Sequence, residues 1–300
     1  IWKKNIYSKP EKKLNPKLFF ALDGENLLVA DNLAKYYSIN INYGELNWSM
    51  NNMYPFNSEI KITENMLFAV DYKNTLRSFN ISDGSELWNF QTENSFAISD
   101  TINSLIVIDN LVIFSNSIGD ITAVDIENGL ITWQLPTQST NIINESYKFR
   151  NSKLVSDKKS IIFSNNKDEF YSIDIKTGVA NWINEVNSSV TPILIGNLIF
   201  TVSNEGYLFV IEKNNGNIIR ITDLYKNYKE KKRADIKPIG FVIGNRNLYL
   251  TNSDGQMLVI DLVTGKSIYN IKVAKSFVSE PFISNENLFV IRKGSIIQYN

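Results

Sequence analysis

Two residue types that build many active sites are missing from this chain of 300 residues, which has no cysteine and no histidine. Without cysteine the protein has no disulfide, no thiolate metal site and no cysteine nucleophile. Without histidine it lacks the commonest general base and metal ligand, which excludes serine–histidine triads and histidine-ligated zinc sites. These absences remove several enzyme classes and leave the cellular compartment open.

Long apolar runs and an excess of one charge are missing as well. No apolar run approaches the roughly 20 residues of a membrane-spanning helix. The 31 basic and 31 acidic residues cancel, which argues against nucleic acid or a charged membrane surface as the dominant ligand. The chain opens on Ile1 rather than Met, so we expect a mature or trimmed chain and leave a signal peptide or lipid anchor upstream open.

What the sequence does have is one short phrase, repeated along its length. The clearest copy is Ala123–Trp133, in which Asp125, Gly129 and Trp133 follow one another at intervals of four. Apolar and polar residues alternate on both sides of Asn128-Gly129, which predicts a strand, a tight turn and a second strand. Glycine accepts the positive φ of such a turn, and we expect Asp125 to bond the turn's own amides.

The other copies of the phrase keep the same spacing. They are Asn40/Gly44/Trp48, Asn80/Gly84/Trp88, Asp174/Gly178/Trp182, the weaker Glu212/Gly216/Arg220 and Asp261/Gly265/Tyr269. Successive glycines are 40, 45, 49, 38 and 49 residues apart. A period of this length, with about four strands in each unit, is typical of a β-propeller.

We therefore predict an all-β fold, a seven-bladed β-propeller that forms a single domain over residues 1–300. The predicted blades are 17–50, 56–90, 104–135, 150–186, 190–221, 237–271, and 279–300 together with 1–6. The last blade lacks a fourth strand, and we expect Ile1–Ile6 to pair with Ile296–Asn300, closing the ring without an open edge. Trp2 would then be the fifth tryptophan of the repeat. Eight blades are the alternative, and we expect no helix of useful length.

The phrase Ala-x-Asp-x-x-x-Gly-x-x-x-Trp resembles the repeat of quinoprotein-type (PQQ-like) propellers, in which the tryptophan docks between neighbouring blades. Ala123–Trp133 matches it fully, and Ser172–Trp182 departs only at the alanine. Within that superfamily the chain most resembles the BamB family, propeller lipoproteins of the outer-membrane β-barrel assembly machinery. The segments that carry this resemblance are Ser203–Leu208, Ser276–Phe282 and Asn287–Tyr299. The family has eight blades rather than seven.

The resemblance to BamB implies a non-enzymatic scaffold without a cofactor, periplasmic and held at the outer membrane by a lipid anchor. It implies the POTRA domains of BamA and other components of the assembly machinery as partners, together with unfolded outer-membrane proteins. We expect a monomer that binds no nucleic acid. In the family the BamA contact uses loops around the middle blades, which here are Glu145, Tyr147 and Arg150 before the fourth blade and Asn204 and Glu205 in the fifth. Tyrosine and arginine are typical interface anchors, although ordinary solvated loops are the alternative.

One long connection, residues 222–236, is rich in basic residues and has no counterpart that we can match in the family. It carries Lys226, Lys229, Glu230, Lys231, Lys232 and Arg233. Such a run either binds a partner or lipid headgroups or is simply a solvated loop.

Two other functions stay open at this stage. A PQQ-dependent dehydrogenase would need carboxylates around a Ca²⁺ ion, and Asp125, Asp174 and Asp261 are the candidates; each lies at the turn of a different blade, which favours turn capping. A generic propeller platform of the WD-repeat type is less favoured, because the Trp-Asp and Gly-His signatures are missing. The aromatic residues, 14 Tyr, 17 Phe and 5 Trp, alternate along strands and so indicate core packing more than sugar or base stacking.

Overall fold

Seven antiparallel sheets make up almost all of the structure, a computed structural model that describes residues 2–93, 102–137, 150–275 and 278–299. The chain divides into two compact units, Ile1–Arg150 and Asn151–Asn300. Because every sheet is formed by strands that are consecutive in the chain, each repeat of the sequence folds into one sheet. That a single domain spans residues 1–300 stays a prediction.

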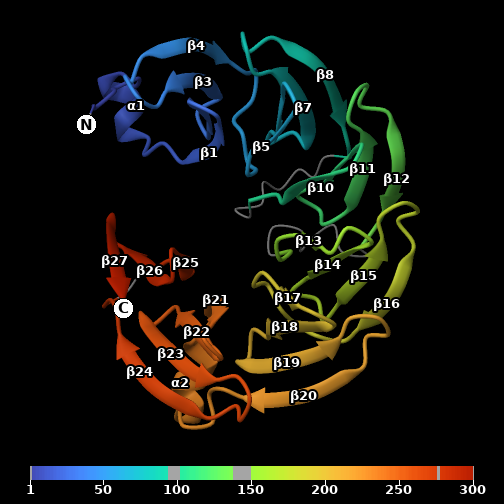
Figure 1. Ribbon diagram of the computed structural model, residues 1–300, viewed down its shortest axis with the longest axis vertical. Coiled ribbons are helices and arrows are strands. Elements are labelled where there is room, and N and C mark those ends of the chain that lie inside the picture. Colours follow the sequence, from blue (N-terminus) through green and yellow to red (C-terminus); the bar gives the residue numbers. More distant parts are fainter. Residues whose placement is uncertain (1, 94–101, 138–149, 276–277, 300) are drawn as a thin grey trace. The chain divides into compact units, whose positions relative to one another are not determined.

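The first unit holds three four-stranded sheets, drawn from blue to green in Figure 1. The first consists of β1 (Leu18–Asp23), β2 (Asn26–Asp31), β3 (Lys35–Asn40) and β4 (Leu46–Asn51). The second consists of β5 (Lys61–Thr63), β6 (Met66–Val70), β7 (Thr75–Asn80) and β8 (Glu86–Gln91). The third consists of β9 (Leu105–Ile108), β10 (Leu111–Ser115), β11 (Ile121–Asp125) and β12 (Ile131–Leu135).

The second unit holds three four-stranded sheets and one of three strands. The fourth and fifth sheets are β13 (Val155–Ser156), β14 (Ser160–Ser164), β15 (Phe170–Asp174) and β16 (Ala180–Asn184), then β17 (Ile193–Ile195), β18 (Leu198–Val202), β19 (Tyr207–Glu212) and β20 (Ile218–Asp223). The sixth and seventh are β21 (Pro238–Gly244), β22 (Asn247–Asn252), β23 (Gln256–Asp261) and β24 (Ser267–Lys272), then β25 (Phe282–Ser284), β26 (Asn287–Arg292) and β27 (Ser295–Tyr299).

The predicted phrase forms the hairpin between the third and fourth strands of each complete sheet. In the third sheet the Asp125 carboxylate accepts hydrogen bonds from the amides of Glu127 and Asn128 at 3.0 and 3.3 Å, and Gly129 has a φ of +70°. Just before the turn a β-bulge shifts the register between Ala123 and Val124. The same bulge recurs at the matching place in the other four-stranded sheets.

Four of the tryptophans contact the glycine turn of a neighbouring repeat, as the repeat predicts. The Trp48 ring of the first sheet lies against Gly84 of the second, and its Nε1–H donates to the Ile81 carbonyl at 2.8 Å. Equivalent contacts are Trp2 with Gly44 and Ile41, Trp88 with Gly129 and Ile126, and Trp182 with Gly216 and Lys213. Apolar clusters between successive sheets of each unit form the core, and the rings of Trp48, Trp88 and Trp182 pack against three of these clusters.

Gly178 is the turn glycine of the fourth sheet, and the structure confirms only its role within that turn. Its φ is +70°, and its N–H donates to the Asp174 carbonyl at 2.9 Å, as the Gly129 N–H does to the Asp125 carbonyl. Its expected partner is Trp133, which is buried in the third sheet. The docking of this ring on Gly178 stays a prediction.

Arg220 takes the place of a tryptophan in the weaker copy of the phrase. Its Nη2 donates to the Leu262 carbonyl and its Nη1 to the Val263 carbonyl, each at 2.6 Å. Leu262 follows Asp261 as Ile81 follows Asn80, so the guanidinium bonds the carbonyl that an indole bonds elsewhere. Thr222, rather than a ring, lies over Gly265.

The N-terminal segment differs in part from expectation. Residues 2–6 form no strand, so their pairing with the seventh sheet stays a prediction, although Trp2 occupies the expected place against Gly44. Two short helices were not expected: α1 (Lys9–Lys13) and α2 (Glu230–Asp235). The first begins with a capping box, in which Ser8 and Glu11 bond each other's backbone amides. Its signal, Ser-x-x-Glu with a proline between, was readable in the sequence.

The contact between ring and glycine can be tested with two Gly→Ala variants. At Gly84, with φ of +77°, a Cβ would lie 2.7 Å from the Trp48 ring, whereas at Gly24, with φ of +55°, it would meet nothing within 4 Å. Both variants share the left-handed backbone strain of about 1–2 kcal/mol, and only Gly84→Ala adds an overpacking cost of roughly 1–3 kcal/mol. Urea unfolding should therefore show Gly84→Ala to be clearly the less stable; equal losses would contradict the packing role.

Candidate partner-binding surface

The turn between β18 and β19 holds two of the predicted contact residues, Asn204 and Glu205. Asn204 is held by its neighbours: its backbone N–H donates to the Asn187 carbonyl at 2.8 Å and its side-chain Nδ2 donates to Asn187 Oδ1 at 2.5 Å. Its Oδ1 accepts from the Ser189 hydroxyl at 2.8 Å. Both ends of this amide therefore serve to fix the turn.

Glu205 is the exposed member of the pair. One of its carboxylate oxygens accepts a hydrogen bond from Asn187 Nδ2 at 3.0 Å, so Asn187 links both residues. A carboxylate that is already oriented loses less conformational entropy when a partner binds it. The geometry thus supports Glu205, more than Asn204, as a residue that a partner can reach.

The connection from β20 to β21 lies directly against this turn. The Leu224 N–H donates to the Gly206 carbonyl at 3.0 Å, and the Tyr225 ring covers Gly206 so closely that it leaves no room for a Cβ there. Tyr225 is fully buried, and its hydroxyl donates to Asn252 Oδ1 at 2.6 Å in the sixth sheet. Burial raises the pKa of Tyr225 well above its ordinary value, so the phenol stays neutral and acts as a donor.

The basic residues of this connection do not form one free charge run. Arg233 pairs with Asp223 at 2.8 Å and lies 4.9 Å from the centre of the Tyr207 ring. Lys232 pairs with Asp254 at 3.3 Å and lies 4.8 Å from the centre of the Tyr228 ring. These contacts attach α2 to the turn edge of the fifth and sixth sheets. All the lysines of the segment are exposed: Lys226, Lys229, Lys231, Lys232 and Lys237.

The remaining predicted contact residues are not brought to this turn by anything that the structure describes. Glu145 and Tyr147 lie outside the described residues. Arg150 is exposed and belongs to the first unit, whereas the turn belongs to the second. The surface defined here therefore consists of the Asn204–Glu205 turn and the adjoining segment 224–237.

Sequence reasoning missed Tyr225 and α2. The basic run of residues 226–233 drew attention to charge, whereas the residue that attaches the segment is an aromatic one at its start. Two tyrosines at an interval of three, Tyr225 and Tyr228, were the available signal; their rings meet edge to face with centroids 5.5 Å apart.

The three carboxylates considered for a Ca²⁺ site each cap their own turn. Asp174 accepts from the amides of Lys176 and Thr177 at 3.0 and 2.9 Å, and Asp261 accepts from the Thr264 amide at 2.6 Å. These backbone hydrogen bonds lower the pKa of both carboxyls. The turn-capping interpretation is confirmed. Within the described ranges no group of three or more acidic residues is arranged to hold a metal ion.

The geometry defines a class of protein: an all-β, seven-bladed propeller built from PQQ-like repeats, as the sequence predicted. A family model described as "Outer membrane protein assembly factor BamB" matches residues 1–222. The chain therefore belongs to this BamB-type family of PQQ-repeat propellers. The match covers the first three quarters of the chain, whereas the resemblance noted in the sequence was clearest in the last third.

Solved structures with the same fold include three of different kinds. BamB from Moraxella catarrhalis aligns with a TM-score of 0.76 and 14% identity over 94% of this chain and 83% of its own. Sqt1 from Saccharomyces cerevisiae aligns with a TM-score of 0.72 and 10% identity over 94% of this chain and 81% of its own. Quinohemoprotein alcohol dehydrogenase from Comamonas testosteroni aligns with a TM-score of 0.64 and 12% identity over 91% of this chain and 63% of its own. At these identities the likeness shows the fold alone.

A comparison with curated proteins gave no match. As for membranes, none of the helices in the described part of the chain is long and apolar enough to cross one.

The role of Tyr225 can be tested by Tyr225→Phe, which removes only the hydroxyl. The buried Asn252 Oδ1 would lose its donor, and we expect a stability loss of about 1–3 kcal/mol. Trypsin should also cleave faster after Lys226 and Lys229, because the segment opens more often. Tyr43→Phe is the control, since Tyr43 is 72% exposed. Unchanged stability and cleavage in Tyr225→Phe would show that the segment is attached in another way.

Proposed function

We propose that this protein is a non-enzymatic scaffold that supports outer-membrane protein assembly by binding the POTRA domains of BamA. The observation that carries the proposal is the family match over residues 1–222. The proposed contact surface is the Asn204–Glu205 turn with the adjoining segment 224–237; Glu145, Tyr147 and Arg150 stay proposed contact residues that are separate from this surface. It follows that the protein acts in the periplasm beside the outer membrane, with a lipid anchor as its attachment.

The physical rationale is that the sheets provide a rigid scaffold and the loops provide the binding residues. Indole rings, turn glycines and backbone carbonyls fix the sheets, and these contacts use the hairpins between third and fourth strands. The turn at Asn204–Glu205 and the segment 224–237 lie at the opposite ends of the strands, away from those hairpins. Rigid scaffolds with binding loops at one edge are common among interaction proteins.

Two alternatives share the fold. A quinoprotein-type dehydrogenase is supported by the structural likeness to an alcohol dehydrogenase, but the carboxylates that could bind Ca²⁺ cap separate turns. A general interaction platform is supported by the likeness to Sqt1. Titration with a quinone cofactor and Ca²⁺ separates the first alternative from a scaffold, because saturable binding would favour an enzyme.

The proposal is tested by measuring the affinity of this protein for the POTRA domains of the cognate BamA. Glu205→Arg reverses the charge of an exposed contact residue, and we expect it to weaken binding by about tenfold. Glu127→Arg, in an exposed turn of the third sheet, is the matched control and should bind as the wild type does. If the wild-type protein shows no binding at tens of micromolar, the proposed function is wrong while the fold is unaffected.

A further inference from the structure

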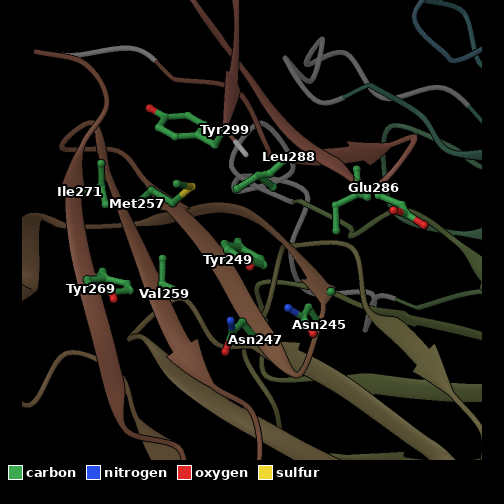
Figure 2. A pocket seen from close by; sticks show the side chains of 12 residues that line it. Asn245, Asn247, Tyr249, Met257, Val259, Tyr269, Ile271, Glu286, Leu288 and Tyr299 are labelled. Atoms are coloured by element: carbon green, nitrogen blue, oxygen red, sulfur yellow. The ribbon is translucent and has the colours of Figure 1, made fainter.

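Between the fourth and fifth sheets lies a cavity of about 350 Å³ whose lining residues are all polar. Those used below are Asp157, Lys159, Ser160, Ser172, Asn181 and Lys213. A larger cavity, of about 740 Å³ between the sixth and seventh sheets, is lined largely by apolar side chains such as Met257, Val259 and Leu288 (Figure 2). The smaller cavity has the size and the lining of a site for a small polar ligand.

Lys213 is the residue at which this cavity departs from the repeat. In the other copies of the phrase the residue after the Asp or Asn of the turn is aliphatic: Ile41, Ile81, Ile126, Ile175 and Leu262. Ile81, Ile126 and Ile175 are buried, whereas the Lys213 side chain is 21% exposed. The backbone contact is kept, because the Trp182 Nε1–H donates to the Lys213 carbonyl at 2.8 Å. A cationic side chain thus replaces an apolar one without loss of the contact between the sheets.

Asp157 holds the ammonium group of Lys213 at the cavity. Lys213 Nζ lies 2.7 Å from Asp157 Oδ2. The other carboxylate oxygen, Oδ1, accepts from the amides of Lys159 and Ser160 at 2.9 and 2.7 Å. Both oxygens of Asp157 are therefore engaged within the protein. An ammonium group carries three N–H donors, and its pairing with Asp157 leaves donors of Lys213 for a ligand.

The other groups of the lining also have donors to offer. Asn181 Nδ2 donates to the hydroxyl oxygens of Ser160 and Ser172, each at 3.2 Å. Because both hydroxyls act as acceptors there, each keeps its own O–H as a donor. Lys159 is exposed and forms no ion pair with any described residue. Two ammonium groups and one carboxylate leave positive charge in excess at this cavity.

We propose that this cavity binds a phosphoryl group, carried either by a small soluble molecule or by a lipid headgroup. A tetrahedral oxyanion has several acceptor oxygens, which match the two lysine ammonium groups and the two serine hydroxyls. Hydrogen bonds of this charge-assisted kind are stronger than those between neutral groups. A neutral sugar would leave the excess positive charge without a counterion. The inference is independent of the proposed function.

The test titrates the 300-residue protein with inorganic phosphate at constant ionic strength and follows the indole N–H signals by NMR. Since the Trp182 indole bonds the Lys213 carbonyl, its signal should shift and saturate, with a Kd of about 1 mM or lower. Trp48 and Trp88 lie in the first unit and serve as internal references. The same titration with chloride gives the shift that salt alone produces.

Two neighbouring lysines provide a matched pair of variants that each remove one positive charge. Lys159→Gln, in the lining, should weaken phosphate binding by about tenfold. Lys158→Gln, at an exposed lysine that does not line the cavity, should change it by less than about twofold, because solvent screens its charge. Lys213→Ile restores the aliphatic residue of the other copies, so the variant should stay folded and lose phosphate binding.

A second pair of ligands identifies the source of the phosphoryl group. A soluble source predicts that glycerol 3-phosphate shifts the Trp182 signal while vesicles containing phosphatidic acid do not sediment the protein. A lipid source predicts sedimentation with these vesicles that Lys159→Gln reduces and Lys158→Gln does not.

Three results would overturn the proposal. The first is a Trp182 signal that moves no further with phosphate than with chloride. The second is an equal loss of affinity in Lys158→Gln and Lys159→Gln, which would reveal a general effect of charge. The third is phosphate binding by Lys213→Ile that is as tight as that of the wild type.

Discussion

The contact between a bulky side chain and the glycine turn of the next sheet is the constraint on which the rest of the structure depends. It combines apolar burial, one hydrogen bond to a carbonyl and a backbone conformation that only glycine adopts without strain. Trp48 also meets Tyr36 edge to face at 5.7 Å, and the Tyr36 hydroxyl donates to the Gly84 carbonyl at 2.9 Å. One turn is thus held from two sides, and the ring-on-glycine contact recurs along the chain.

This constraint also decides where function is to be sought. It uses the hairpins that carry Asp125, Asp174 and Asp261, so these carboxylates serve the fold. The opposite strand ends carry the Asn204–Glu205 turn and the segment that Tyr225 attaches to it.

Most of the fold could be predicted because the repeat is local: glycine, turn cap and tryptophan lie within nine residues, so their spacing is visible in the sequence. Arg220 was read as a weak copy, since nothing in a sequence shows that a guanidinium will bond the carbonyl of Leu262. The candidate site is harder to predict from the sequence than the fold is. Asn187, Asn204 and Tyr225 come together through contacts between segments, and no spacing in the sequence reveals these contacts.

The most direct test of this account is a double-mutant cycle between Trp48 and Gly84. Stability is measured by urea unfolding followed by circular dichroism for the wild type, Trp48→Leu, Gly84→Ala and the double variant. If the ring is what excludes a Cβ at Gly84, the cost of Gly84→Ala should fall by at least about 1 kcal/mol in the Trp48→Leu background. Strict additivity of the two substitutions would contradict the claim that this contact joins the sheets.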